Sequence, residues 1–126
     1  FKQYNDNYGH GAGDECLTRI AKALNGCVQR PGDLLARYGG EEFAAILINT
    51  PEEGALRMAE VIHAAVAALQ IPHAFSATAP HVSVSIGIAT AIPSPALTAD
   101  ILSEAADNML YQAKNAGRNT TRSTQL

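Results

Sequence analysis

Two glutamates stand side by side directly after two glycines, in the run Arg37-Tyr38-Gly39-Gly40-Glu41-Glu42-Phe43. Carboxylate oxygens are the ligands that Mg²⁺ prefers in proteins, and a carboxylate can also act as a general base. Taken alone, the pair fits a solvated surface turn about as well as it fits a metal site, because acidic residues are common in turns. Glu41 and Glu42 are therefore candidate metal-binding and catalytic residues, and their surroundings must decide between the two interpretations.

A polar, glycine-rich stretch over residues 5–14 leads into the first expected helix. Glycines allow a backbone to come close to a ligand. The stretch is weak as a phosphate cradle, because the carboxylate of Asp14 at a helix start would repel phosphate from the positive end of the helix dipole. That carboxylate could instead accept two hydrogen bonds from a donor edge, and N1–H and N2–H₂ of guanine form such an edge.

Basic side chains that could meet phosphate oxygens are few. Lys114 and Arg118 stand four residues apart at the end of the last expected helix, where cations suit the helix dipole, and Lys2 is a further candidate. Cations at helix ends are usually structural. Arg30 and Asp33 form an Arg-x-x-Asp pattern ahead of the glycine pair, which has meaning only through its position.

Composition bounds the function class. The 126 residues, of which 47% are hydrophobic and 17% charged, suffice for one globular domain. The formal charge of -3 and the lack of a basic run argue against nucleic-acid binding. Cys16 and Cys27 fall in one expected helix roughly 16 Å apart, too far for a disulfide. Free thiols fit a reducing cytoplasm, and the four histidines show no zinc-ligand spacing.

Three helices are predicted from apolar residues at three-and-four spacing and from residues typical of helix ends. The first is capped by Asp14 and ends near Gln29. The second begins at Thr50, which a proline and two acids follow. The last is capped by Thr98 and ends at Gly117.

Strands are predicted on both sides of the glycine pair and further along the chain. Residues 34–38 and 43–48 should form a hairpin, because paired glycines suit a tight turn, and residues 82–88 alternate as a half-buried strand does. Residues 1–6 are loop-like, and the polar tail from Thr120 onward is expected to fray. The order is typical of an α+β, two-layer fold with helices packed on a mainly antiparallel sheet.

Four motifs together resemble the GGDEF family, the diguanylate cyclases, over nearly the whole chain. They are the block from Phe1 to Asp14, the signature from Arg37 to Phe43 in its Glu-Glu form, the run Ser85-Ile86-Gly87, and the block from Ala106 to Asn119. They occur in the family's order and at its spacing. We therefore expect a GGDEF domain over residues 1–119 and a polar tail over residues 120–126.

The resemblance implies a palm-like fold, similar to that of adenylyl cyclases. It also implies a bacterial signalling enzyme that condenses two GTP molecules to cyclic di-GMP and releases two pyrophosphates. Each domain holds one GTP, so the implied catalytic form is a homodimer in which the 3′-hydroxyl of one nucleotide attacks the α-phosphorus of the other. The implied cofactor is Mg²⁺ or Mn²⁺.

The matching motif positions imply the role of each residue. Glu41 ligates the metal, and Glu42 ligates it or takes the 3′-hydroxyl proton. Gly39 and Gly40 keep side chains away from the phosphates. Asn5 and Asp14 hold guanine, a type of contact that rejects adenine. The residues implied to neutralise the triphosphate are Lys2, Lys114 and Arg118.

Arg30 and Asp33 match the spacing that marks the family's inhibitory product site, so feedback by cyclic di-GMP is a hypothesis. Family members often add a second arginine where this chain has Val61, with Arg57 one turn earlier, so the site is expected to be incomplete. The alternative is an ordinary surface ion pair, worth at most about 1 kcal/mol.

The family's domain normally opens with a central strand that ends in Asp-x-Asp-x-Phe and carries a metal-binding aspartate. The chain begins at Phe1, after that point. We therefore expect a longer parent protein to supply this strand and a sensor domain upstream. We also expect the 126-residue chain to expose unpaired strand edges and to be inactive alone. Whether the parent is anchored in a membrane stays open.

Two other function classes are considered. A non-catalytic GGDEF-type regulatory domain would bind GTP or cyclic di-GMP, and the intact signature argues against it. An α/β interaction module would have no nucleotide site, and the four ordered motifs argue against that.

Overall fold

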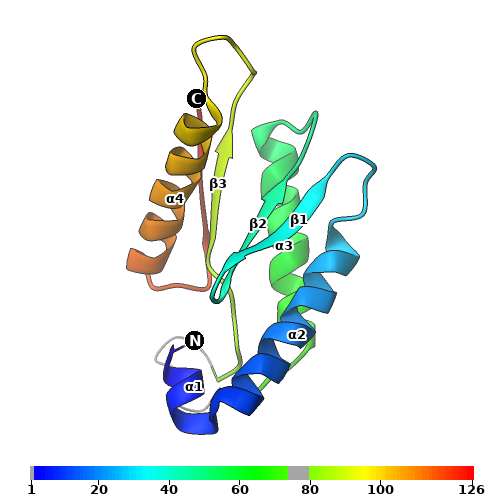
Figure 1. The fold of residues 1–126 in the computed structure, drawn as a ribbon, viewed down its shortest axis with the longest axis vertical. Coiled ribbons are helices and arrows are strands. Elements are labelled where there is room, and N and C mark those ends of the chain that lie inside the picture. The colour runs from blue at the N-terminus through cyan, green and yellow to red at the C-terminus, as the bar shows by residue number, and fades with distance from the viewer. Residues whose placement is uncertain (1, 74–79) are drawn as a thin grey trace. The chain divides into compact units, whose positions relative to one another are not determined.

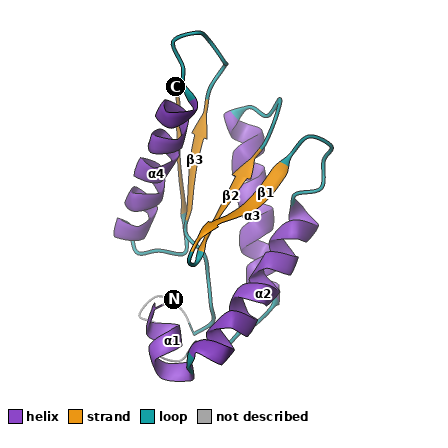
Figure 2. Ribbon diagram, viewed as in Figure 1, coloured by secondary structure: helices purple, strands orange, loops and turns teal. Residues whose placement is uncertain are grey.

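The computed structural model describes residues 2–73 and 80–126, apart from the side chains of residues 2 and 3. Its elements are α1 (Lys2–Tyr8), α2 (His10–Cys27), β1 (Leu34–Gly39), β2 (Glu42–Ile46), α3 (Glu52–Ala68), β3 (Ile86–Thr90), α4 (Ala99–Asn115) and β4 (Thr121–Gln125) (Figure 1). Figure 2 separates helices, strands and loops by colour. The predicted order of helix, hairpin, helix, strand and helix is confirmed, with α1 and β4 in addition.

The chain divides into two compact units. One comprises Phe1–Ile48 with Val61–Ser83, and the other Asn49–Glu60 with Val84–Leu126. The first unit contains α1, α2 and the β1–β2 hairpin.

The segment ahead of the first predicted helix is itself helical over residues 2–8, which corrects the expectation of a loop over residues 2–6, and residue 1 lies outside the described part. Its helix, α1, has seven residues and places Tyr4 and Tyr8 one turn apart. Helices this short are marginal on their own and depend on packing. Tyr4 is buried, and its ring lies 5.3 Å from that of His73.

Gly9 separates α1 from α2. Its φ is +87°, a conformation that glycine adopts readily and other residues rarely do. Its N–H donates to the carbonyl oxygen of Asn5 at 2.8 Å, and its own carbonyl accepts from the N–H of Gly13 at 3.0 Å. Helix α2 therefore begins at His10, with Gly9 as its N-cap.

The apolar side predicted for α2 is confirmed at Leu17, Ile20 and Leu24, which are buried. The helix ends at Cys27 rather than near Gln29, and both cysteines are free thiols, as predicted. Its buried side is formed by Gly13, Cys16, Leu17, Ile20 and Leu24.

Strands β1 and β2 form the predicted antiparallel hairpin. Leu34 pairs with Ile46 at the open end, and Gly39 pairs with Glu42 at the tip. Both strands are largely exposed. Within residues 2–73 and 80–126, β2 pairs only with β1.

The segment after α3 is held by a short antiparallel bridge. The Val82 N–H donates to the carbonyl of Ile71 at 2.8 Å, and the His73 N–H donates to the carbonyl of Pro80 at 2.7 Å. The strand predicted over residues 82–88 is thus confirmed in its later part only, because its first residues belong to this bridge region and β3 begins at residue 86.

In the second unit, β4 runs parallel to β3, with Ile86 opposite Thr121. The N–H of Leu126 donates to the carbonyl of Thr90 at 2.8 Å. The expectation that the tail frays from Thr120 onward is wrong, because backbone hydrogen bonds to β3 order it as a strand.

Helix α4 packs along both of these strands. The prediction that Thr98 caps it is confirmed, since its Oγ1 accepts from the N–H of Ile101 at 3.2 Å. A Cβ added to Gly87 of β3 would lie 2.7 Å from Cα of Leu110. The backbones of β3 and α4 therefore approach so closely that only glycine fits at position 87. This contact explains the glycine of the run Ser85-Ile86-Gly87.

The predicted stop of α4 at Gly117 is also confirmed. The N–H of Arg118 donates to the carbonyl of Ala113 at 3.1 Å, and the N–H of Gly117 to that of Lys114 at 3.4 Å. This is the hydrogen-bond pattern of a Schellman motif, with Gly117 at a φ of +108°.

Helices combined with two small sheets fit the α+β class predicted from the sequence. None of the helices in the described ranges is long and apolar enough to cross a membrane.

Candidate nucleotide and metal site

The tip of the β1–β2 hairpin presents the paired carboxylates. Glu41 is exposed in the turn, and Glu42 is half-buried as the first residue of β2. Arg37 pairs with Phe43 and Gly39 pairs with Glu42, so β1 has one residue more than β2 at this point. Bulges of this kind often lie next to functional sites, because they re-aim the neighbouring side chains.

The turn is closed by a side chain from β1. Nε of Arg37 donates to the carbonyl oxygen of Gly40 at 2.7 Å, and Gly40 has a φ of +52°. This bond fixes the backbone next to Glu41 and Glu42. This role of Arg37 was not predicted from the sequence, and its position three residues before Gly40 is the signal that could have suggested it.

The two carboxylates fit a metal ion that a nucleotide helps to hold. Among the described residues, no group of three or more His, Cys, Asp or Glu side chains could enclose a metal. Mg²⁺ is commonly bound by one or two carboxylates together with substrate phosphates rather than by a protein cage. Glu41 and Glu42 supply those two carboxylates.

Asn5 and Asp14 lie on α1 and α2, on either side of the break at Gly9. Oδ1 of Asn5 is buried and has no hydrogen-bond partner in the described part of the chain. Buried polar atoms normally have a partner, so this one is ready for a donor from a ligand. The prediction that Asp14 caps a helix is wrong, because Asp14 lies inside α2 with an exposed side chain. Its carboxylate can still accept hydrogen bonds.

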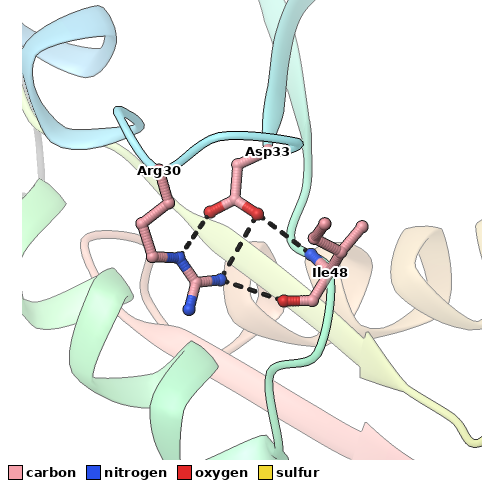
Figure 3. Close-up of polar contacts among 3 residues, drawn as sticks. All are labelled: Arg30, Asp33 and Ile48. Atoms are coloured by element: carbon pink, nitrogen blue, oxygen red, sulfur yellow. Dashed lines mark hydrogen bonds and ion pairs between the residues drawn. The ribbon is translucent and has the colours of Figure 1, made fainter.

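Arg30 and Asp33 form an ion pair that also holds the end of the hairpin (Figure 3). Nε and one terminal nitrogen of Arg30 donate to the Asp33 carboxylate at 2.8 and 3.3 Å. The same terminal nitrogen donates to the carbonyl of Ile48 at 3.1 Å, and the Ile48 N–H donates to Asp33 at 3.0 Å. The hydrogen bonds of Ile48 could not be predicted from the sequence, because main-chain partners leave no side-chain signal.

This ion pair is shielded on one side only. The Asp33 side chain is 0% exposed, whereas that of Arg30 is 52% exposed. The hydrogen bond from Arg30, followed by that from Ile48, lowers the pKa of Asp33. The guanidinium is thus oriented by the protein while part of it remains reachable from solvent.

The three candidate phosphate-binding residues lie in different parts of the chain. Lys2 lies on α1, and nothing is described of its side chain. Lys114 is half-buried in the last turn of α4. Arg118 follows the helix rather than ending it, with a φ of +62°. Lys114 and Arg118 belong to the second unit, whereas the hairpin tip, Asn5 and Asp14 belong to the first.

Comparisons with known proteins agree on one family. Residues 1–120 match the family model described as "Diguanylate cyclase, GGDEF domain". The chain is 44% identical over 119 residues to diguanylate cyclase DgcM of Escherichia coli (strain K12), a match that covers 94% of this chain and 27% of DgcM. It is 40% identical over 119 residues to diguanylate cyclase A of Treponema denticola, a match that covers 94% of this chain and 31% of that protein. The chain thus spans about a quarter to a third of these relatives.

Solved structures show the same fold. The GGDEF domain of DgcB from Caulobacter crescentus, in complex with c-di-GMP, has a TM-score of 0.80 at 31% identity, covering 98% of this chain and 70% of that one. The active GGEEF domain of a diguanylate cyclase from Vibrio cholerae has a TM-score of 0.77 at 30% identity, covering 97% and 74%. The palm-like α+β class predicted from the sequence is confirmed.

Proposed function

Because the chain belongs to the GGDEF diguanylate cyclase family, we propose that it is a catalytic domain that condenses two GTP molecules to cyclic di-GMP and releases two pyrophosphates. One observation carries this proposal: the hairpin turn that presents Glu41 and Glu42 is closed by Arg37. A turn fixed in this way holds carboxylates in position without help from a bound ligand, which favours catalysis.

The metal is proposed to be Mg²⁺ or Mn²⁺, held by Glu41 and Glu42 together with the nucleotide phosphates. When bound, it polarises the phosphoryl group and offsets the charge that develops on it. Glu42 is also proposed to accept the 3′-hydroxyl proton, because a half-buried carboxylate beside the turn can act as a general base. Gly39 and Gly40 leave the backbone open to the phosphates.

Guanine is proposed to bind between α1 and α2. The exposed carboxylate of Asp14 accepts from N1–H and N2–H₂, and the unpartnered Oδ1 of Asn5 accepts from the same edge. Adenine lacks these donors, so both acceptors would be left unpaired. The triphosphate charge is assigned to Lys2, Lys114 and Arg118.

Two copies are required, since each domain holds one GTP and the 3′-hydroxyl of one nucleotide attacks the other. We therefore propose a homodimer of GGDEF domains, located in the cytoplasm and controlled by an upstream sensor domain. The reachable part of the Arg30 guanidinium is proposed to bind cyclic di-GMP phosphate or guanine and to inhibit the enzyme.

The test is the formation of cyclic di-GMP from GTP and Mg²⁺ by the full-length protein that contains this chain. Glu42→Gln should lower turnover at least about 100-fold, as loss of a general base does. Glu53→Gln changes an exposed glutamate in the first turn of α3 in the same way and should not lower it.

Three outcomes decide among the hypotheses. Turnover that depends on Glu42 supports the cyclase. GTP binding without any product in the unaltered protein supports a non-catalytic regulatory domain, and the absence of GTP binding removes both. The 126-residue chain, assayed beside it, is expected to make no more product than its own Glu42→Gln variant.

A further inference from the structure

A buried histidine packs against the helix that carries Asn5. The ring of His73 lies edge-on to Tyr4, with centroids 5.3 Å apart and an interplanar angle of 87°. It is also edge-on to Tyr8, at 6.2 Å and 74°, and the two tyrosine rings lie 4.7 Å apart. Edge-to-face aromatic contacts at such separations are favourable. The three rings form a cluster that joins α1 to the segment after α3.

His73 is the fixed partner in this cluster. The backbone N–H of His73 donates to the carbonyl of Pro80 at 2.7 Å, and the backbone N–H of Val82 donates to the carbonyl of Ile71. The flanking side chains of Ile71 and Val82 are themselves buried. Helix α1 has only seven residues and so depends on contacts of this kind.

The His73 ring suits the neutral state. It is 7% exposed, and its Nδ1 is buried without a hydrogen-bond partner among the described residues. Burial of the ring lowers the pKa of His73. A protonated ring would carry a second N–H donor and a charge, and its Nδ1 finds no acceptor among the described residues.

The other ionisable groups around the cluster do not offset that charge. Tyr4 and Tyr8 face the ring from α1, and exposed His81 stands on the opposite side of the bridge. From α2, Glu15, Cys16 and Arg19 act on Tyr4. No described carboxylate acts on His73.

We infer that His73 is a positioning residue for nucleotide binding: its neutral ring holds Tyr4 and Tyr8, and with them α1 and Asn5, and its protonation releases the helix. The inference rests on the proposed function in one respect, the role of Asn5 in binding guanine. The association of His73 with α1 stands apart from it.

The first measurement is the affinity of the chain for GTP with Mg²⁺, by isothermal titration from about pH 7.5 to about pH 5.5. The unaltered chain should lose affinity as the pH falls below 6.5, the ordinary pKa of the ring, by up to about tenfold per pH unit until the lowered pKa of the packed ring is reached. His73→Phe keeps an aromatic ring that cannot be protonated and should flatten this profile. His81→Phe makes the same change at the exposed neighbour and should leave the profile as it was.

The second measurement needs no nucleotide. Hydrogen exchange of the Gly9 amide, which donates to Asn5, reports whether α1 is formed. After correction for the intrinsic pH dependence of exchange, its protection should fall on acidification in the unaltered chain and in His81→Phe but not in His73→Phe. Equal acid sensitivity in all three, or none in any, would overturn the inference.

The two measurements separate the proposals. If GTP does not bind at any pH, the proposed function fails, and the exchange of Gly9 still decides the role of His73. If GTP binds with the same pH profile in His73→Phe as in the unaltered chain, the positioning role fails and the proposed function stands.

Discussion

Nε of Arg37 lies 2.7 Å from the carbonyl oxygen of Gly40, so a side chain of β1 closes the turn that carries both glutamates. We expect Arg37→Ala to lower cyclic di-GMP formation by about 10- to 100-fold, because a loosened turn misplaces Glu41 and Glu42. The unfolding free energy should change by at most about 1 kcal/mol, as the bond is exposed to solvent.

The matched control is Arg122→Ala, which removes an exposed arginine that bonds the carbonyl of the adjacent Thr121. Turnover assays and urea denaturation of both variants check the prediction. Equal turnover in the two variants would show that the turn keeps its shape without Arg37.

Gly87→Ala should destabilise the chain by about 1–3 kcal/mol or more, because the added methyl group meets the backbone of α4 rather than a side chain that could move. Gly26→Ala in α2 has open space around the new methyl group and should instead stabilise by up to about 1 kcal/mol. Thermal unfolding of both variants decides. A neutral Gly87→Ala would mean that β3 and α4 do not approach as described.

Thr98→Ala should cost about 1 kcal/mol of stability, since the N–H of Ile101 loses its capping partner. Thr98→Ser retains a hydroxyl and should restore most of the loss. Denaturant midpoints of the three proteins test this, and a Ser variant as unstable as Ala would place the effect outside the cap.

Acid should weaken the contact at the open end of the hairpin. The folded-state pKa of Asp33 lies below its value of 3.8 in an unfolded chain, because Arg30 and the Ile48 N–H bond the carboxylate. Its contribution to stability is therefore full above about pH 4 and is lost as the pH falls further, when the unfolded state binds a proton more readily. Asp33→Asn should remove this part of the acid dependence, measured by urea unfolding over that range. An unchanged pH profile would contradict it.

Product inhibition predicts that Arg30→Ala lowers the affinity for cyclic di-GMP by at least about tenfold, as loss of a charge-assisted hydrogen bond would. Isothermal titration measures the affinity, with Arg122→Ala as the control. Circular dichroism is needed as well, because Arg30 also bonds Ile48. Unchanged affinity in a folded Arg30→Ala protein would remove the product site and leave a structural ion pair.

The sequence predicted those parts of the fold that nearby residues determine. The cap at Thr98, the stop at Gly117 and the turn at Gly40 are local, and all three are present. Helix α1 was missed because its residues are polar and its stability comes from the contact between Tyr4 and His73, which are far apart in the chain.

Strand β4 was missed for a related reason. Its residues are polar and show no apolar alternation, and its partner β3 lies on the far side of α4 in the sequence. Parallel pairing needs such a crossover and leaves no turn signal. The same limit applies to the candidate site. The motifs supplied its residue types, whereas the bond from Arg37 to Gly40 and the unpartnered oxygen of Asn5 required coordinates.

The clamp formed by Arg30, Asp33 and Ile48 bears on the order in which the chain folds. It closes a loop of 18 residues that contains the whole β1–β2 hairpin, and the bond from Arg37 to Gly40 closes the tip. All of these contacts are short in sequence, so the entropy lost on forming them is small. The β3–β4 pair must wait until α4 has crossed between its strands. The turn that carries Glu41 and Glu42 therefore belongs to the part of the molecule that can fold early, before segments distant in the sequence have come into contact.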